Sequence, residues 1–94
     1  MAMNETLKAI SDPVRREILN MLKSQSLPAG EIAAQFDLTA ATVSYHLKLL
    51  KQAQLITERH DGNFIYYDLN ASVFEEVLSW IYSLGVGGDL NDKK

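Results

Sequence analysis

The chain contains no cysteine among its 94 residues. This absence excludes disulfide bonds, thiolate metal sites and thiol-based redox sensing. No apolar run approaches the roughly 18 residues that a membrane-spanning helix needs, and no signal-peptide pattern opens the chain. We therefore expect a cytoplasmic protein. With 47% hydrophobic residues, the chain fits one small globular domain with a modest core.

Catalytic patterns are also missing. The sequence shows no Ser/His/Asp, Cys/His or paired-carboxylate constellation, and no glycine-rich phosphate loop follows a strand pattern. Its two histidines, His46 and His60, fall on different predicted elements. We expect neither an enzyme nor a bound cofactor.

Basic charge is scarce overall, because the net charge is −3. The excess of acidic residues lies in the last third of the chain. Residues 1–60 hold seven basic and six acidic side chains, whereas residues 61–94 hold two basic and six acidic ones. This balance argues against tight, indiscriminate DNA binding driven by charge alone. A DNA-facing surface in the first two thirds of the chain stays compatible with it.

The most informative stretch, residues 28–53, predicts two helices joined by a tight polar turn. In the second helix an apolar stripe repeats at helical spacing, formed by Val43, Leu47 and Leu50. The opposite face has no carboxylate and carries small, hydroxylated or basic residues, namely Ala40, Ala41, Ser44, Tyr45 and Lys48. Such a helix suits a DNA groove. An ordinary solvated surface helix more often mixes Glu and Lys.

The turn between these helices has its own signals. We expect Leu38 to point inward and Thr39 to cap the second helix. Short helix, tight turn and longer helix form the helix-turn-helix pattern.

Two more helices are predicted upstream, at about residues 4–10 and 13–24. Asp12 is positioned to cap the second of them. On that helix, Arg16 follows Asp12 by four residues and is spaced to pair with it, while Arg15 lies at the edge of the core. The sequence leaves open whether the two arginines pack on the helix surface or contact phosphate.

Beyond the recognition-type helix, the hydrophobic period changes to about two. Residues 55–59 and 64–69 are β-branched and aromatic runs, joined by a turn centred on residues 61–62. A hairpin in this place is a wing, expected to touch the DNA backbone or minor groove. Arg59 is the leading candidate for that contact, with Asn63 as a neutral donor.

The final predicted helix, at about residues 71–84 with Asn70 as its cap, is too apolar for one buried stripe, since seven of its fourteen positions are apolar. A second copy of the chain would cover the excess. Together with the first helix it forms the expected dimer interface: Met3, Leu7, Ile10, Phe74, Val77, Leu78, Trp80, Ile81 and Leu84. We expect the domain to span residues 3–84, with residues 85–94 as a flexible tail.

Three motifs in order carry a family resemblance: DPVRR at residues 12–16, TVSYHLKLL at 42–50 and YYDLN at 66–70. Together they resemble the ArsR/SmtB-type winged helix-turn-helix repressors. The lack of cysteine, the wing ending and Trp80 make the chain most similar to the SdpR-type autorepressors. The resemblance implies a mainly α fold with a β-hairpin wing, five helices in the order α-α-α-α-β-β-α, and a homodimer.

The resemblance also implies a repressor that binds an inverted-repeat operator, often in front of its own operon. It places base reading and phosphate contacts on these residues: Ala40, Ala41, Thr42, Ser44, Tyr45, Lys48, Lys51, Arg59 and Asn63. Because an alanine offers only an apolar contact, such as one to a thymine methyl, direct readout should be sparse and DNA shape should contribute.

Metal-sensing relatives use a Cys-x-Cys pair before the turn or Asp/His clusters on the last helix. Here residues 31–36 read EIAAQF and residues 71–84 contain no histidine, so no metal site is expected. His46 is interpreted as a packing or DNA-side residue, and His60 as an exposed turn residue. The SdpR-type resemblance implies release by a membrane-bound partner that sequesters the repressor.

One alternative function stays open. A winged-helix protein-interaction module that has lost DNA binding would use its apolar terminal helix on another protein. The net acidity and the two alanines on the expected reading face support this alternative.

Overall fold

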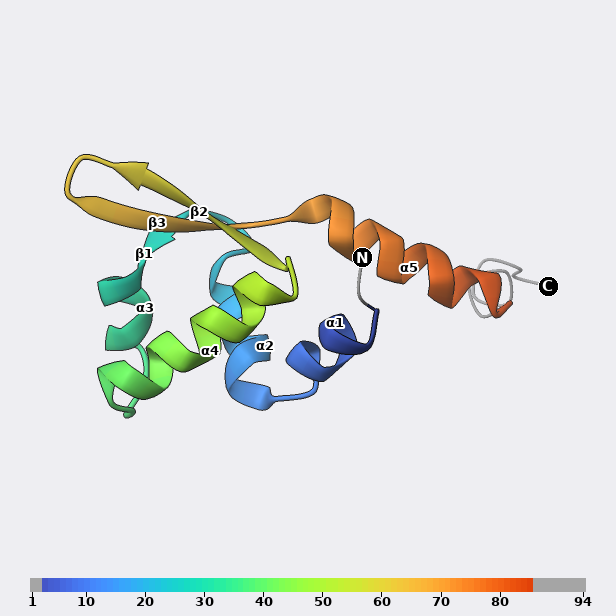
Figure 1. Ribbon diagram of the computed structural model, residues 1–94, viewed down its shortest axis with the longest axis horizontal. Coiled ribbons are helices and arrows are strands. Elements are labelled where there is room, and N and C mark those ends of the chain that lie inside the picture. Colours follow the sequence, from blue (N-terminus) through green and yellow to red (C-terminus); the bar gives the residue numbers. More distant parts are fainter. Residues whose placement is uncertain (1–2, 86–94) are drawn as a thin grey trace.

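The computed structural model describes residues 3–85, in which the first four helices lie on one side of a three-stranded antiparallel sheet (Figure 1). The elements in order are α1 (Met3–Ile10), α2 (Pro13–Met21), β1 (Leu27–Pro28), α3 (Ala29–Ala34), α4 (Ala40–Gln52), β2 (Ile56–Asp61), β3 (Phe64–Leu69) and α5 (Ala71–Ser83). This architecture confirms the predicted winged helix-turn-helix with its five helices and β-hairpin wing. It adds one short strand, β1, that the sequence did not predict.

Helix α2 begins where predicted because Asp12 closes its first turn. Asp12 Oδ1 accepts hydrogen bonds from the N–H groups of Val14 at 2.8 Å and Arg15 at 3.2 Å. The helix ends at Met21 instead of residue 24, because its last N–H bonds tighten to a three-residue spacing.

The turn before α4 is partly as predicted. Thr39 caps the helix, since its hydroxyl accepts from the N–H of Thr42 at 3.1 Å. The prediction that Leu38 points inward is wrong, because Leu38 is 41% exposed. The core residues on either side of this turn are Ile32 on α3 and Val43 on α4, both buried.

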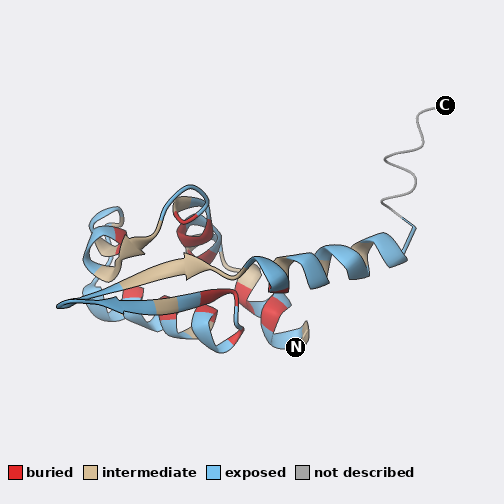
Figure 2. Ribbon diagram, turned by 90° about the horizontal axis from the view of Figure 1, so that it is seen from above, coloured by how far each residue is buried: buried red, intermediate tan, exposed pale blue. Residues whose placement is uncertain are grey.

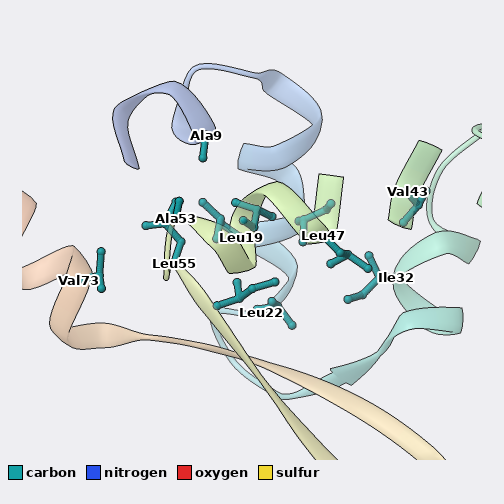
Figure 3. Close-up of a cluster of buried hydrophobic side chains, with 12 residues drawn as sticks. Ala9, Leu19, Leu22, Ile32, Val43, Leu47, Ala53, Leu55 and Val73 are labelled. Carbon is teal, nitrogen blue, oxygen red and sulfur yellow. The ribbon is translucent and has the colours of Figure 1, made fainter. Parts of the chain in front are cut away.

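The core confirms the predicted stripe of α4. Val43, Leu47 and Leu50 are all buried, and they join residues from α2, α3 and the start of β2 in one cluster (Figure 3). Burying each such side chain stabilises the fold by about 1.5–3 kcal/mol. The stripe therefore fixes how α4 is rotated, and the opposite face of α4 is left at the surface.

The sheet has the strand order β1-β3-β2. Asp61 pairs with Phe64, so the hairpin turn consists of Gly62 and Asn63, one residue later than predicted. Gly62 has a positive φ of 63°, and a positive φ at the first turn residue alone is the pattern of a type II′ hairpin. The turn begins at Gly62 and not at Asp61, because its first residue has a positive φ, which glycine adopts without strain.

Strand β1 occupies the start of the stretch that was predicted as a helix over residues 28–36. Leu27 pairs with Tyr67, and Pro28 with Tyr66, on the outer edge of β3. Proline has no N–H for a strand ladder, and an edge strand tolerates it. Helix α3 is therefore shorter than predicted and covers Ala29–Ala34.

The junction after α4 uses a left-handed residue. Gln54 has a φ of 63°; its N–H donates to Lys51 O at 2.9 Å, and the N–H of Leu55 donates to Leu50 O at 3.0 Å. This is the Schellman pattern, with glutamine where glycine is usual. Asn70 does not cap α5 through its side chain as predicted: its Oδ1 accepts from the hydroxyl of Ser72 at 2.9 Å, and its Nδ2 donates to Gln54 O at 2.9 Å.

Helix α5 leaves the body of the molecule. Figures 1 and 2 show it projecting from the end of β3, and Val73 is its one buried residue. It ends before Gly85, whose φ is 92°. The predicted tail lies outside the described residues apart from Gly85. None of α1–α5 has the length and apolar character needed to cross a membrane.

Candidate nucleic-acid interface

The outer face of α4 carries the predicted reading residues. All five of them, which we call the α4 ridge, are exposed: Ala40, Ala41, Ser44, Tyr45 and Lys48. Tyr45 is the largest, and it is 56% exposed. The ridge has no carboxylate, so nothing on it opposes a phosphate backbone electrostatically.

Thr42 belongs to the helix cap more than to the ridge. It is half-buried, and its hydroxyl lies 2.9 Å from the hydroxyl of Thr39. Its polar group therefore already has a partner within the chain.

Two surface hollows flank α4. The first, of about 180 Å³, lies between α4 and the sheet and is lined by Ala29, Ser44, Leu47, Lys48, Lys51 and Tyr67. The second lies between α4 and α1, and Tyr45 lines it together with Lys8 and Arg15. Ser44 and Lys48 thus border the wing side of α4, while Tyr45 borders the α1 side.

The three predicted cationic contacts differ in their partners. Within residues 3–85, the ammonium of Lys48 has neither an ion pair nor a hydrogen bond. Lys51, by contrast, donates from Nζ to Oε1 of Glu58 on β2. This hydrogen bond and the charge of Glu58 raise the pKa of Lys51 above its ordinary value. Lys48 is therefore the free cation of α4.

Arg59 is held by its own wing. Its guanidinium lies 5.1 Å from the ring centre of Tyr66, its Nε lies 3.5 Å from Asp68 Oδ2, and its Nη1 lies 3.9 Å from Asp61 Oδ2. The two carboxylates offset much of the charge predicted to attract DNA. Asn63 is exposed in the turn, at the end of the hairpin farthest from α5 (Figure 1).

Arg15 is an internal residue and is committed to other groups. It is 8% exposed; its Nε donates to Ala9 O at 2.8 Å, its Nη2 donates to Lys8 O at 3.3 Å, and its Nη1 lies 3.0 Å from His46 Nδ1. Because arginine has no acceptor, Nδ1 of His46 accepts this bond. The question that the sequence left open is settled for Arg15: it ties α1 and α2 to α4.

Arg16 stays at the surface, where Nη1 donates to Ile10 O at 2.9 Å. Its proposed pairing with Asp12 is wrong for the described part of the chain, whose ion pairs do not include it. The carboxylate of Asp12 is used instead to cap α2.

The two histidines do not come together. His46 is buried on α4 against Arg15, which agrees with its interpretation as a packing residue. His60 is exposed, but on β2 instead of in the turn. In residues 3–85 no group of three or more His, Asp or Glu side chains is placed to hold a metal ion.

The predicted dimer residues divide into two groups. The exposed ones are Leu7, Leu78, Trp80 and Leu84, at 38–60% exposure. The half-buried ones are Met3, Ile10, Phe74, Val77 and Ile81, and of these Ile10 and Phe74 pack on the chain's own core. Sequence reasoning left out Tyr82, which is 48% exposed on α5.

Sequence reasoning also missed Glu58 and Tyr67, which approach α4 from the wing. The signal for Glu58 was present, because it follows the inward-facing Ile56 by two residues and strand side chains alternate. Its partner Lys51 lies seven residues earlier on another element, which no local pattern reveals.

The helix-turn-helix domain family matches residues 10–59. The transcriptional repressor SdpR of Bacillus subtilis (strain 168) is 44% identical over 87 residues, which cover 93% of this chain and 97% of SdpR. The arsenical resistance operon repressor of Staphylococcus aureus is 36% identical over 72 residues, covering 77% of this chain and 69% of that protein.

Solved structures agree on the fold. A crystal structure of an ArsR family transcriptional regulator superposes with a TM-score of 0.82 at 22% identity, covering 98% of each chain. HlyU from Vibrio cholerae N16961 gives a TM-score of 0.71 at 26% identity, covering 87% of this chain and 89% of HlyU.

These relatives are named as regulators, so the expectation that the chain is not an enzyme is confirmed. The membrane-bound partner implied by the resemblance finds no support among them. The chain belongs to the ArsR family of winged helix-turn-helix transcriptional regulators, and it resembles the SdpR-type repressors within that family.

Proposed function

We propose that this chain is a transcriptional repressor that binds an inverted-repeat operator as a homodimer, with α4 of each copy in a major groove. The α4 ridge is the observation that carries the proposal. Its five residues are exposed and include no carboxylate, while the opposite stripe of α4 is buried in the core. A rigid helix with such a face matches the width and the donor and acceptor pattern of a major groove.

Base reading would fall mainly on Ser44 and Tyr45. Both carry hydroxyl groups that donate and accept hydrogen bonds, whereas Ala40 and Ala41 offer methyl groups for apolar contact with thymine. With so few polar readers, the shape and deformability of the operator should supply part of the specificity.

Backbone contacts would begin with Lys48, the free cation of α4. Lys51 and Arg59 are already paired with carboxylates, so they add less attraction for phosphate. Affinity should therefore be moderate at physiological salt, and it should depend on two copies binding together.

The second copy would dock on α5. Leu78, Trp80 and Leu84 are exposed on this projecting helix, together with Leu7 on α1. Exposed apolar side chains concentrated on a helix that projects from the body favour an interaction site there. A two-fold dimer would present two α4 ridges in opposite directions, which requires inverted half-sites in the operator.

Binding to the DNA upstream of the chain's own gene tests the proposal, including autorepression. The expected result is a specific complex whose log K falls by about 0.9 per contacted phosphate for each unit of log salt concentration. A scrambled fragment of equal length should bind far more weakly. Equal, weak binding to both fragments at all salt concentrations would instead favour the protein-interaction module.

A further inference from the structure

A carboxylate of the wing points at the recognition helix. Glu58 lies opposite Tyr67 in the β2–β3 ladder, on the face of the hairpin that looks toward α4. Its Oε1 accepts a hydrogen bond from Nζ of Lys51, in the last turn of α4. The side chains of Glu58 and Lys51 are 26% and 46% exposed, so solvent and ligands reach this ion pair.

The pair stands beside the hollow between α4 and the sheet. Ser44, Lys48 and Lys51 line this hollow from α4, and Tyr67 lines it from the sheet. Two cations and a hydroxyl donor are the groups with which proteins hold a phosphate oxygen. The hollow continues the α4 ridge through Ser44 and Lys48, so a DNA strand beside the ridge would pass it.

We propose that Glu58 is an internal competitor for a DNA phosphate: it occupies Lys51 in the free protein, and a backbone phosphate seated in the hollow replaces it. This inference rests on the proposed DNA-binding function. It adds a phosphate site between α4 and the wing, and it gives the wing residue Glu58 control over how much Lys51 contributes to binding.

The consequence is a weaker electrostatic contribution from Lys51. A lysine without a protein partner replaces a cation condensed on the DNA phosphate, and binding releases that cation. Lys51 must leave Glu58 to bind a phosphate, and the freed carboxylate attracts a cation in turn, so Lys51 adds little to the net release of cations. Lys48, which has no such partner in the described chain, contributes in full. Glu58 thereby limits affinity for every DNA sequence alike, because a phosphate contact carries no base information.

The variant Glu58→Gln tests this directly, because glutamine keeps the shape and removes the charge. We expect it to bind the operator about two- to five-fold more tightly at low salt, which is the range of an exposed ion pair. The salt slope should become steeper by up to about 0.9, because no Glu58 carboxylate is freed to take up a cation when Lys51 moves to the phosphate. Scrambled DNA should gain by the same factor. Glu17→Gln, an exposed charge removal on α2, should change neither quantity beyond a small long-range effect.

The control for mechanism is the same substitution in a Lys51→Ala background. There Glu58→Gln should give a clearly smaller gain, because only the general removal of negative charge is left. Equal gains in both backgrounds, or no gain in the wild-type background, would overturn the proposal. A wild-type protein that binds no DNA would instead refute the proposed function itself. Matching urea unfolding curves establish that all variants are folded.

Discussion

Arg15 Nη1 lies 3.0 Å from His46 Nδ1 and joins α2 to the buried side of the recognition helix. The same guanidinium binds the carbonyl oxygens of Ala9 and Lys8 at the end of α1. One side chain thus connects three helices, and it lines the hollow between α1 and α4 together with Tyr45 of the α4 ridge. The proposed DNA-reading face is therefore held in place by an arginine that the sequence could equally have assigned to a phosphate contact.

We expect Arg15→Ala to lower the free energy of unfolding by about 2–4 kcal/mol, because it leaves buried acceptors without their donor. Arg16→Ala is the matched control, since Arg16 makes one exposed bond, to Ile10 O. That change should stay within about 0.5 kcal/mol. Urea denaturation compares the two variants. Similar small losses for both would show that Arg15 has no structural role.

Acid should weaken the cap of α2. Partial burial acts to raise the pKa of Asp12, but the N–H groups of Arg15 and Val14 and the charge of Arg15 outweigh it, so the pKa is lowered. The charge of Asp12 therefore stabilises the fold fully above about pH 4, and this stabilisation is lost as pH falls through the lowered pKa.

The variant Asp12→Asn tests this acid effect, because asparagine caps a helix without titrating in this range. Between about pH 6 and about pH 2, the wild type should lose more stability than this variant, because only the wild type loses a charge at the cap. Parallel loss of stability in the two proteins would contradict the assignment of the titration to Asp12.

Lys48→Ala should weaken binding to operator and scrambled DNA by similar factors. It removes the free cation of α4, so the slope of log K against log salt should become shallower by about 0.9. Fluorescence anisotropy at several salt concentrations measures this. A loss confined to the operator would mean that Lys48 reads bases.

Tyr45→Ala should reduce discrimination as well as affinity, since Tyr45 is the largest group on the α4 ridge. Loss of one good base contact costs about 1–3 kcal/mol of discrimination. Tyr45→Phe isolates the hydroxyl and keeps the edge-on ring contact with His46. If Tyr45→Ala leaves sequence preference unchanged, this side of α4 does not face the bases.

Trp80→Asp should convert dimers to monomers and lower operator affinity. It places an unpaired carboxylate in the proposed apolar interface, where its desolvation is costly. Ser79→Asp is the control on the same helix, because Ser79 is not among the apolar residues of α5. Sedimentation equilibrium distinguishes the two states. An intact Trp80→Asp dimer would place the interface elsewhere.

The sequence predicted those parts of the fold that local chemistry determines. The buried stripe of α4 follows from its helical period, and the caps from Asp12 and Thr39 follow from side chains next to the groups they satisfy. Strand β1 was missed because two residues, one of them proline, carry no readable period. It forms only because β3, far along the chain, offers an edge.

The candidate site divides in the same way. Exposure of the α4 ridge followed from the position of the stripe, so its residues could be chosen from the sequence. The partners of Arg15 and Lys51 could not, because His46 and Glu58 reach them from other elements. These long-range contacts determine which side-chain cations are already paired within the protein. Lys48 is therefore expected to contribute more to the proposed DNA binding than Lys51 or Arg59.

Selection of DNA by the protein from a random pool tests whether a dimer reads DNA through α4. We expect enrichment of two half-sites in inverted orientation, with centres about 10 base pairs or a multiple of that apart, as two α4 helices on one side of the duplex require. We also expect the Tyr45→Ala protein to select a less defined sequence. Recovery of no common sequence, or of a single unpaired half-site, would contradict a dimeric repressor that reads DNA through α4.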